Sequence, residues 1–238
     1  MSWGYYAPYV SAAERRKKAE KQIAKLRKNK PNISPVVIDG KKIAITWWGE
    51  SWNKNFSRYA DYENRIQRGS AYVKNGFVLD LQILNGMITA KVYGSSLYDI
   101  TIQIEPLSER QWQFISAQAS KRLDSLAELA AGKFPKELQN IFFDIENGLF
   151  PKPKEINFKC NCPDYYENHM CKHIAAALYG VGNRLDSDPL LFFKLRGVDP
   201  AEMIRASIDD RAKSLLKNAG KKSKRVISEE DAERLFGV

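Results

Sequence analysis

The residues with the clearest chemistry lie together in one short segment of the second half of the chain. In CNCPDYYENHMCKH, a Cys-x-Cys pair is followed after eight residues by a Cys-x-His pair. All three cysteines and both histidines of the protein fall within these fourteen residues. The two pairs consist of Cys160, Cys162, Cys171 and His173. Zinc prefers thiolate and imidazole ligands, and an odd number of clustered cysteines favours a metal site over a disulfide framework.

The spacing within each pair suits a single ion. Residues two apart on a strand point to the same face, so Cys160 and Cys162 can direct both sulfurs at one site. Cys171 and His173 lie where a helix begins, at HIAAALYG, and the amides of a helix N-terminus favour thiolate. We therefore predict a small zinc-binding ββα module, a β-hairpin followed by a helix, over residues 151–182.

Four protein ligands fill the tetrahedral shell of zinc and leave no position for a substrate or an activated water. We therefore expect one structural zinc ion as the cofactor. His169 is the alternative fourth ligand, because it also lies two residues from Cys171. Buried reduced cysteines beside an incidental histidine, or a redox-active Cys-x-Cys pair, are the other interpretations of the segment.

No other pattern in the sequence predicts catalysis. The glycines match neither a Walker nor a Rossmann phosphate loop. Because both histidines lie in the cysteine segment, no Ser-His-acid set can be assembled elsewhere. We therefore expect no catalytic residue and no enzyme.

The positive charge of the chain is concentrated near its two ends. The formal net charge is +10 at pH 7; residues 14–30 hold nine Lys or Arg and two Glu, and residues 211–225 hold seven Lys or Arg and no acid. Basic arms suit contact with a polyanion, because each cation that meets a phosphate releases counterions. The alternative is that these runs are solvated helix faces.

A dense aromatic cluster lies near two arginines. Its members are Trp47, Trp48, Trp52, Tyr59 and Tyr62. With Arg65 and Arg68 nearby it could stack on single-stranded nucleic acid, although we favour core packing, because WWGESW lies between a predicted strand and helix. Together with the basic arms and the lysines beside the zinc ligands, these arginines complete the candidate nucleic-acid contacts: Arg15, Arg16, Lys17, Lys18, Arg65, Arg68, Lys159, Lys172, Lys221, Lys222, Lys224 and Arg225.

Turn pairs and alternating apolar residues predict an antiparallel meander over residues 36–105. The pairs Asp39-Gly40, Asn75-Gly76 and Asn85-Gly86 favour the two-residue turns of β-hairpins. In LYDITIQIE, apolar and polar residues alternate as on a strand with one buried face. Strands are expected near residues 70–74, 77–84, 87–93 and 97–105.

Capping signals predict helices on both sides of the meander. Ser11 and Glu14 form a capping box that opens a helix running to about Lys30. Ser108 and Gln111 open a second helix, which Gly132 ends. A third helix is expected between Pro135 and Gly148, and a mostly helical stretch from the zinc segment to about Lys217.

We therefore expect an α+β protein in which an antiparallel sheet is packed by helices. Its parts would be an aromatic and basic N-terminal arm and helix (1–35), an α+β body (36–150), the zinc module (151–182), a C-terminal helical region (183–218) and a basic tether with a short helix (219–238). No apolar run is long enough to span a membrane and no secretory signal is evident, so we expect a cytoplasmic protein.

The Cys-x-Cys and Cys-x-His pairs, followed by HIAA, resemble the SWIM zinc finger. Residues 8–205 resemble the stand-alone prokaryotic SWIM proteins, notably in TWWGESWNKNFSRYADYENRIQRGSAYVKNGFVLDLQI and GSSLYDITIQIEPL. The resemblance implies that Cys160, Cys162, Cys171 and His173 hold zinc, and that a Swi/Snf-type helicase ATPase is the partner. The linker YYENHM departs from the family in being longer and more polar.

These observations predict a DNA-binding adapter that works with such a helicase, with no membrane or small-molecule substrate. One alternative is a pure protein-interaction subunit. Another is a recombination mediator that binds a recombinase. The terminal ISEEDAERLFGV could dock on a partner or pack against its own domain.

Overall fold

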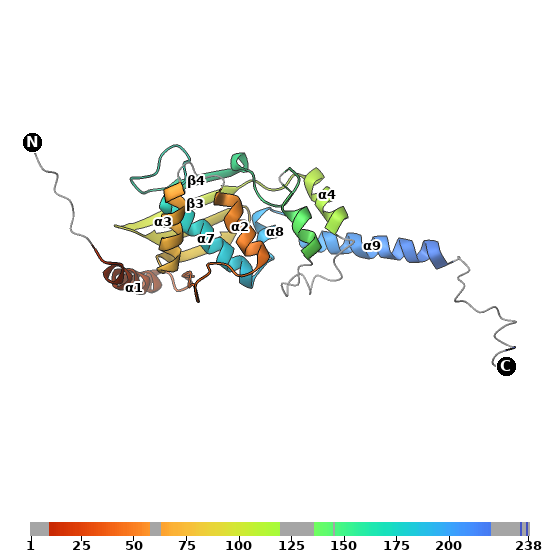
Figure 1. The fold of residues 1–238 in the computed structure, drawn as a ribbon, viewed down its shortest axis with the longest axis horizontal. Helices are drawn as coiled ribbons and strands as arrows, with labels where there is room; N and C mark the ends of the chain where they lie inside the picture. The colour runs from red at the N-terminus through yellow and green to blue at the C-terminus, as the bar shows by residue number, and fades with distance from the viewer. Residues whose placement is uncertain are drawn as a thin grey trace, which may run out of the picture.

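Helices are packed against a four-stranded antiparallel sheet (Figure 1). The computed structural model describes residues 10–57, 63–119, 136–144 and 146–219, together with Arg234 and Gly237. The strands run in the order β1-β2-β3-β4. Their bounds are β1 Val78–Leu84, β2 Met87–Tyr93, β3 Leu97–Ile104 and β4 Ile156–Cys160.

Local sequence signals account for the first three strands. The Asn85-Gly86 turn joins β1 to β2, with Leu84 opposite Met87 and Gly86 at φ +64°. This positive φ is the conformation that favours glycine in a tight hairpin. On β3, alternate residues are buried, among them Ile100 and Ile102. The mixed α/β fold and these three strands confirm the prediction.

Helices pack around this sheet. The α-helices are α1 Ala12–Asn29, α2 Trp47–Ser57, α3 Glu63–Lys74, α4 Glu109–Ala119, α6 Gln139–Phe142, α7 Lys172–Ser187, α8 Leu191–Leu195 and α9 Pro200–Ala219, and two short 3-10 helices are η2 Lys136–Leu138 and η3 Pro153–Glu155. None of the helices in these described stretches combines the length and apolar character that a membrane span requires.

Helix α7 is the centre of the helical layer. It contacts all four strands on one side and α2 and α3 on the other. Small residues allow the close approach: a Cβ added to Gly69 of α3 would lie 2.5 Å from the Cβ of Ala175 on α7. Most of α7 is buried, which is typical of a helix that packs on more than one side.

Helix α1 has the predicted capping box and is fastened to the body. The Glu14 amide donates to Ser11 Oγ at 3.2 Å, and the Ser11 amide donates to the Glu14 carboxylate. At the other end, Lys30 pairs at 3.0 Å with the buried carboxylate of Asp80. Burial alone would raise the pKa of Asp80, but hydrogen bonds from the Ser34 amide, Gln82 and Lys30 outweigh it and lower that pKa.

Two of the predicted turns do not form hairpins. The strand expected near residues 70–74 is wrong, because these residues belong to α3, and Gly76 at φ +72° follows the helix end. Gly69, Tyr72 and Val73 are buried at the i, i+3, i+4 spacing of a helix face. Gly40 also has a positive φ, yet no strand flanks it.

The helix expected between Pro135 and Gly148 is shorter than predicted. In the described residues 136–144 and 146–148, only η2 and α6 form, although Leu138 and Phe142 are buried as expected. The carboxylate of Asp144 accepts the amides of Glu146 and Asn147, and such local bonds compete with a helix. The preceding helix is α4, whose predicted extension lies outside the described residues.

The cysteine segment belongs to the sheet and does not form the expected hairpin. Its one strand, β4, pairs with β3, with Cys160 opposite Ile100 and Phe158 opposite Ile102. Residues 161–171 contain no second strand. The predicted ββα arrangement is therefore wrong, and β4 instead extends the sheet of the body. The predicted C-terminal helical stretch is confirmed by α7, α8 and α9, whereas residues 220–233 of the tether lie outside the described part of the chain.

Candidate metal centre

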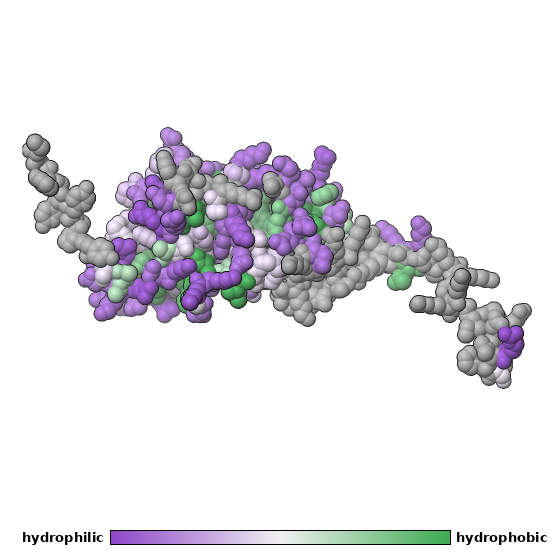
Figure 2. Space-filling model, viewed as in Figure 1, coloured by the Kyte–Doolittle hydropathy of each residue, from purple (hydrophilic) through white to green (hydrophobic). Residues whose placement is uncertain are grey.

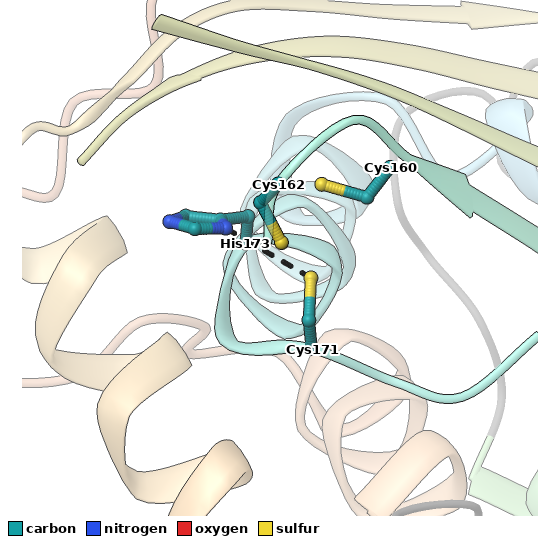
Figure 3. Close-up of side chains that lie close together, drawn as sticks. All are labelled: Cys160, Cys162, Cys171 and His173. Carbon is teal, nitrogen blue, oxygen red and sulfur yellow. Dashed lines mark hydrogen bonds between the residues drawn. The ribbon is translucent and has the colours of Figure 1, made fainter. Parts of the chain in front are cut away.

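Four side chains from the cysteine segment converge at the junction of β4 and α7 (Figure 3). They are Cys160, Cys162, Cys171 and His173, all buried, and their candidate ligand atoms lie within 4.8 Å of one another. The Nδ1 atom of His173 is 3.9 Å from the Sγ atom of Cys171. The structure therefore brings together the four residues that the spacing predicted, and they could hold one metal ion.

Each ligand is positioned by an element of the core. Cys160 is the last residue of β4, and Cys162 lies in the turn that follows. Cys171 is the N-cap of α7 and His173 lies in its first turn. Because β4 pairs with β3 and α7 packs on all four strands, the two ligand pairs meet only when the sheet and α7 are assembled.

The polar linker between the two pairs is bound to β4. The Tyr165 hydroxyl donates to the carbonyl of Phe158 at 2.5 Å, and the Phe158 amide donates to the side chain of Asn168. Asn168 adopts φ +61°, a conformation that asparagine tolerates better than most residues. The segment YYENHM is therefore long and polar enough to supply hydrogen-bond partners to the backbone of β4 at the free edge of the sheet.

The three thiols are electrostatically unequal. A hydrogen bond from Cys160 lowers the pKa of Cys171 to about 4, with help from His173 and the amide of Ile174 at the start of α7. Conversely, the bond to Cys171 together with burial raises the pKa of Cys160. Burial and the charge of Cys171 raise the pKa of Cys162. One thiolate in this buried group opposes the ionisation of its neighbours.

This donor set fits a metal ion. A tetrahedral shell with metal–sulfur bonds of about 2.3 Å places its sulfurs about 3.8 Å apart, which is compatible with the observed spread of the ligand atoms. A cation among the thiols would stabilise all three as thiolates. The four protein ligands would complete the tetrahedral shell of this cation and leave no position for another ligand.

His169, the alternative ligand, lies outside the group. Its Nδ1 atom is 3.1 Å from the carbonyl oxygen of Tyr166 and 3.0 Å from that of Glu167. Its ring stacks on Tyr166 with centroids 4.2 Å apart. The structure therefore places His173, and not His169, beside the three cysteines.

Four of the predicted nucleic-acid contacts come together in space. Arg15, Lys18, Arg68 and Lys172 line one cavity, although they come from α1, α3 and α7. The same cavity is lined by residues that the sequence analysis did not single out: Val10, Tyr72, Tyr93, Gly94 and Ser95. No sequence signal could have found them, because spacing along the chain does not show which helices meet.

The other predicted contacts are dispersed or lie outside the described residues. Arg16 donates to Asn75 at 2.5 Å, which fastens α1 to the end of α3. Lys17 is exposed on α1 and Lys159 is exposed on β4. Arg65 lies on α3 in a half-buried position. The basic tether residues outside the described part of the chain are Lys221, Lys222, Lys224 and Arg225.

The tryptophans of the aromatic cluster contribute to the core, as favoured from the sequence. Trp52 is 2% exposed and donates its indole N–H to the carbonyl of Leu178 on α7 at 2.8 Å. Trp48 donates in the same way to Leu185 at 2.9 Å. These rings therefore fasten α2 to α7. Tyr59 and Tyr62 lie outside the described residues.

Comparison with known proteins identifies one similar curated sequence. An uncharacterized protein of Mycobacterium tuberculosis (strain ATCC 25618 / H37Rv), Rv2102, is 32% identical over 165 residues. The match covers 68% of this chain and 58% of that protein, so the chain spans little more than half of its length. No protein-family model matches the chain. No solved structure matches it either.

The assignment of His173 predicts unequal effects of replacing the two histidines. His173→Gln should weaken metal binding by about 100-fold or more, since even the partners of metal ligands contribute 10- to 100-fold. His169→Gln should leave the affinity within about threefold of the parent protein. Competition with a chromophoric chelator measures both affinities after loading with zinc. Loss of metal from the His169 variant alone would show that the ligand assignment is wrong.

The pKa values of the thiols predict that metal binding releases protons. At pH 7 the lowered pKa keeps Cys171 ionised, whereas the raised pKa values keep Cys160 and Cys162 protonated. A bound ion would displace the two retained protons, about two per ion, and its affinity should rise with pH. Calorimetric titration in buffers of different ionisation enthalpy counts these protons. Affinity that is constant between pH 6 and 8 would contradict the prediction.

Proposed function

We propose that the chain is a SWIM-type zinc protein that acts as a nucleic-acid-binding adapter. Three thiolates and one imidazole form a soft donor set that suits zinc. The Cys-x-Cys and Cys-x-His spacing, followed directly by α7, supports the SWIM assignment. Zinc in this site has a structural role.

That role follows from where the ligands lie. Cys160 ends the edge strand β4, and His173 begins the central helix α7. An ion between them ties the edge of the sheet to the helix on which α2 and α3 pack. Since four protein ligands leave no position for substrate or water, we propose no enzymatic reaction at the site.

Nucleic-acid binding is supported above all by the convergence of Arg15, Lys18, Arg68 and Lys172 on one cavity. Cations that meet at one surface attract a polyanion more strongly than the same charges dispersed over the protein. Helix α1, which contributes Arg15 and Lys18 to this cavity, carries further exposed cations, among them Lys21 and Lys25. The proposed binding surface is therefore α1, the adjoining end of α3 and the start of α7.

The proposed partner is a Swi/Snf-type helicase ATPase. This part of the proposal is supported by the resemblance to stand-alone prokaryotic SWIM proteins, which are associated with such enzymes. In this arrangement the adapter binds a strand of nucleic acid, and the ATPase supplies the energy for movement along that strand.

A second candidate function, a protein-interaction subunit, is favoured by helix α9. Its first half packs against α4: Met203 is buried, and the Trp112 indole N–H donates to the Glu202 carboxylate at 2.6 Å. Its second half extends beyond the body (Figures 1 and 2). It carries the exposed apolar residues Leu215 and Leu216, the latter 76% exposed. An exposed apolar helix face is typical of a surface that docks on another protein.

The adapter proposal predicts salt-sensitive binding of single-stranded DNA. Four cations that meet phosphates should give a slope of about −3 or steeper in a plot of log affinity against log salt. Fluorescence anisotropy of a labelled oligonucleotide with the zinc-loaded protein measures this slope. The double variant Leu215→Asn/Leu216→Asn should bind DNA as the parent does, because α9 lies outside the basic surface. Absence of binding at about 50 mM salt would contradict the proposal and favour the interaction subunit.

A further inference from the structure

We propose that the cavity beside the metal centre binds a phosphate group, and that His173 donates a hydrogen bond to it from Nε2. The inference rests on the proposed function in one respect, because it takes the phosphate to be that of a nucleic-acid strand. It goes further by assigning a specific site, and by making one metal ligand part of that site.

The cavity is large enough for a nucleotide unit. Its volume is ≈ 400 Å³, within the range typical of ligand sites in proteins. Helix α1 forms one wall, α3 and the start of α7 form others, and the end of β2 with the turn after it completes the lining. The sheet, the central helix and α1 must therefore all be in place for the site to exist.

The lining is strongly basic. Arg15, Lys18, Arg68 and Lys172 contribute four cations, and none of the described lining residues is acidic. Lys172 is held in place by an ion pair with Asp164, and its side chain is only 12% exposed. Arg15 lies over the ring of Phe77, 5.8 Å from its centroid. Cations approaching from several helices suit a tetrahedral oxyanion, which accepts hydrogen bonds in several directions.

His173 presents an unpaired nitrogen on this side. The residue is 1% exposed, and its Nε2 atom has no hydrogen-bond partner among the described residues. Its Nδ1 atom faces Cys171, and the opposite side of the ring points away from the thiols (Figure 3). When Nδ1 holds a metal ion, Nε2 carries the proton and becomes a donor. Metal-bound histidines almost always give this second N–H to an oxygen acceptor.

At position 94 only glycine fits beside Nε2 of His173. A Cβ atom at this position would lie 2.8 Å from Nε2 of His173 and 2.9 Å from the ring of Tyr98. Tyr98 and Tyr72 pack against the imidazole, with ring centroids 4.4 and 5.4 Å away, so the ring cannot turn to find another partner. His173, whose Nε2 is unpaired among the described residues, and Gly94 beside it both belong to the lining of the cavity.

The test compares two pairs of charge-removing substitutions in the zinc-loaded, full-length chain. Lys18→Gln/Arg68→Gln removes two cations from the cavity. Lys41→Gln/Arg110→Gln removes the same two residue types from exposed positions outside α1, α3 and α7 and outside the lining. We expect the cavity pair to weaken binding of single-stranded DNA by about tenfold or more, and the control pair by at most about threefold.

A third variant tests the role of His173 without changing any charge. Gly94→Ala keeps every cation and every metal-ligand residue but adds a methyl group against Nε2 of His173. Compared with the parent at equal zinc content, it should weaken DNA binding about tenfold. In the parent protein, nuclear magnetic resonance should show the Nε2–H signal of His173 shifting when DNA is added. The same measurement with inorganic phosphate and with a mononucleotide identifies the source of the phosphate.

The outcomes separate this inference from the proposed function. Equal losses in the cavity pair and the control pair, with an unmoved His173 signal, would overturn the phosphate site but leave nucleic-acid binding intact. A His173 signal that moves with inorganic phosphate in a protein that binds no DNA would overturn the adapter function and retain the site for a free phosphate compound. No binding of any of the three probes would overturn both.

Discussion

The structure depends on the contact of three buried thiols and one imidazole at the junction of β4 and α7. Helix α7 packs on all four strands and on α2 and α3, so its first turn determines how the sheet and the helices meet. Buried thiols in contact cannot all ionise unless a cation lies among them. A metal ion at this point would remove the repulsion between the three thiolates. Its bonds to the four ligands would connect the sheet edge to the central helix.

The same junction connects the core to the basic cavity. His173 directs Nδ1 toward the cysteines, and both His173 and the neighbouring Gly94 belong to the lining of the cavity. Metal binding at Nδ1 determines that Nε2 is a hydrogen-bond donor. The metal centre and the cavity therefore share the imidazole ring of His173. In the proposed phosphate site, a structural ion would influence phosphate binding through His173 without taking part in a reaction.

Local signals predicted much of this arrangement, and contacts distant in sequence account for what they missed. Capping at Ser11 and the Asn85-Gly86 turn act within a few residues, and both formed as expected. Asn75-Gly76 has the same kind of turn sequence, yet packing of α3 on α7 makes it a helix end. The ligand quartet was predictable because its members share one segment. The pairing of β4 with β3 and the meeting of Arg15, Arg68 and Lys172 depend on tertiary structure, which spacing does not encode.

The most direct test of the central claim is X-ray absorption spectroscopy at the zinc edge of the purified, metal-loaded protein. A site formed by the three cysteines and His173 predicts three sulfur ligands at about 2.3 Å and one nitrogen ligand at about 2.0 Å, with no further light ligand. A shell dominated by oxygen or nitrogen, or one with fewer than three sulfur ligands, would contradict a closed structural site at the junction of β4 and α7.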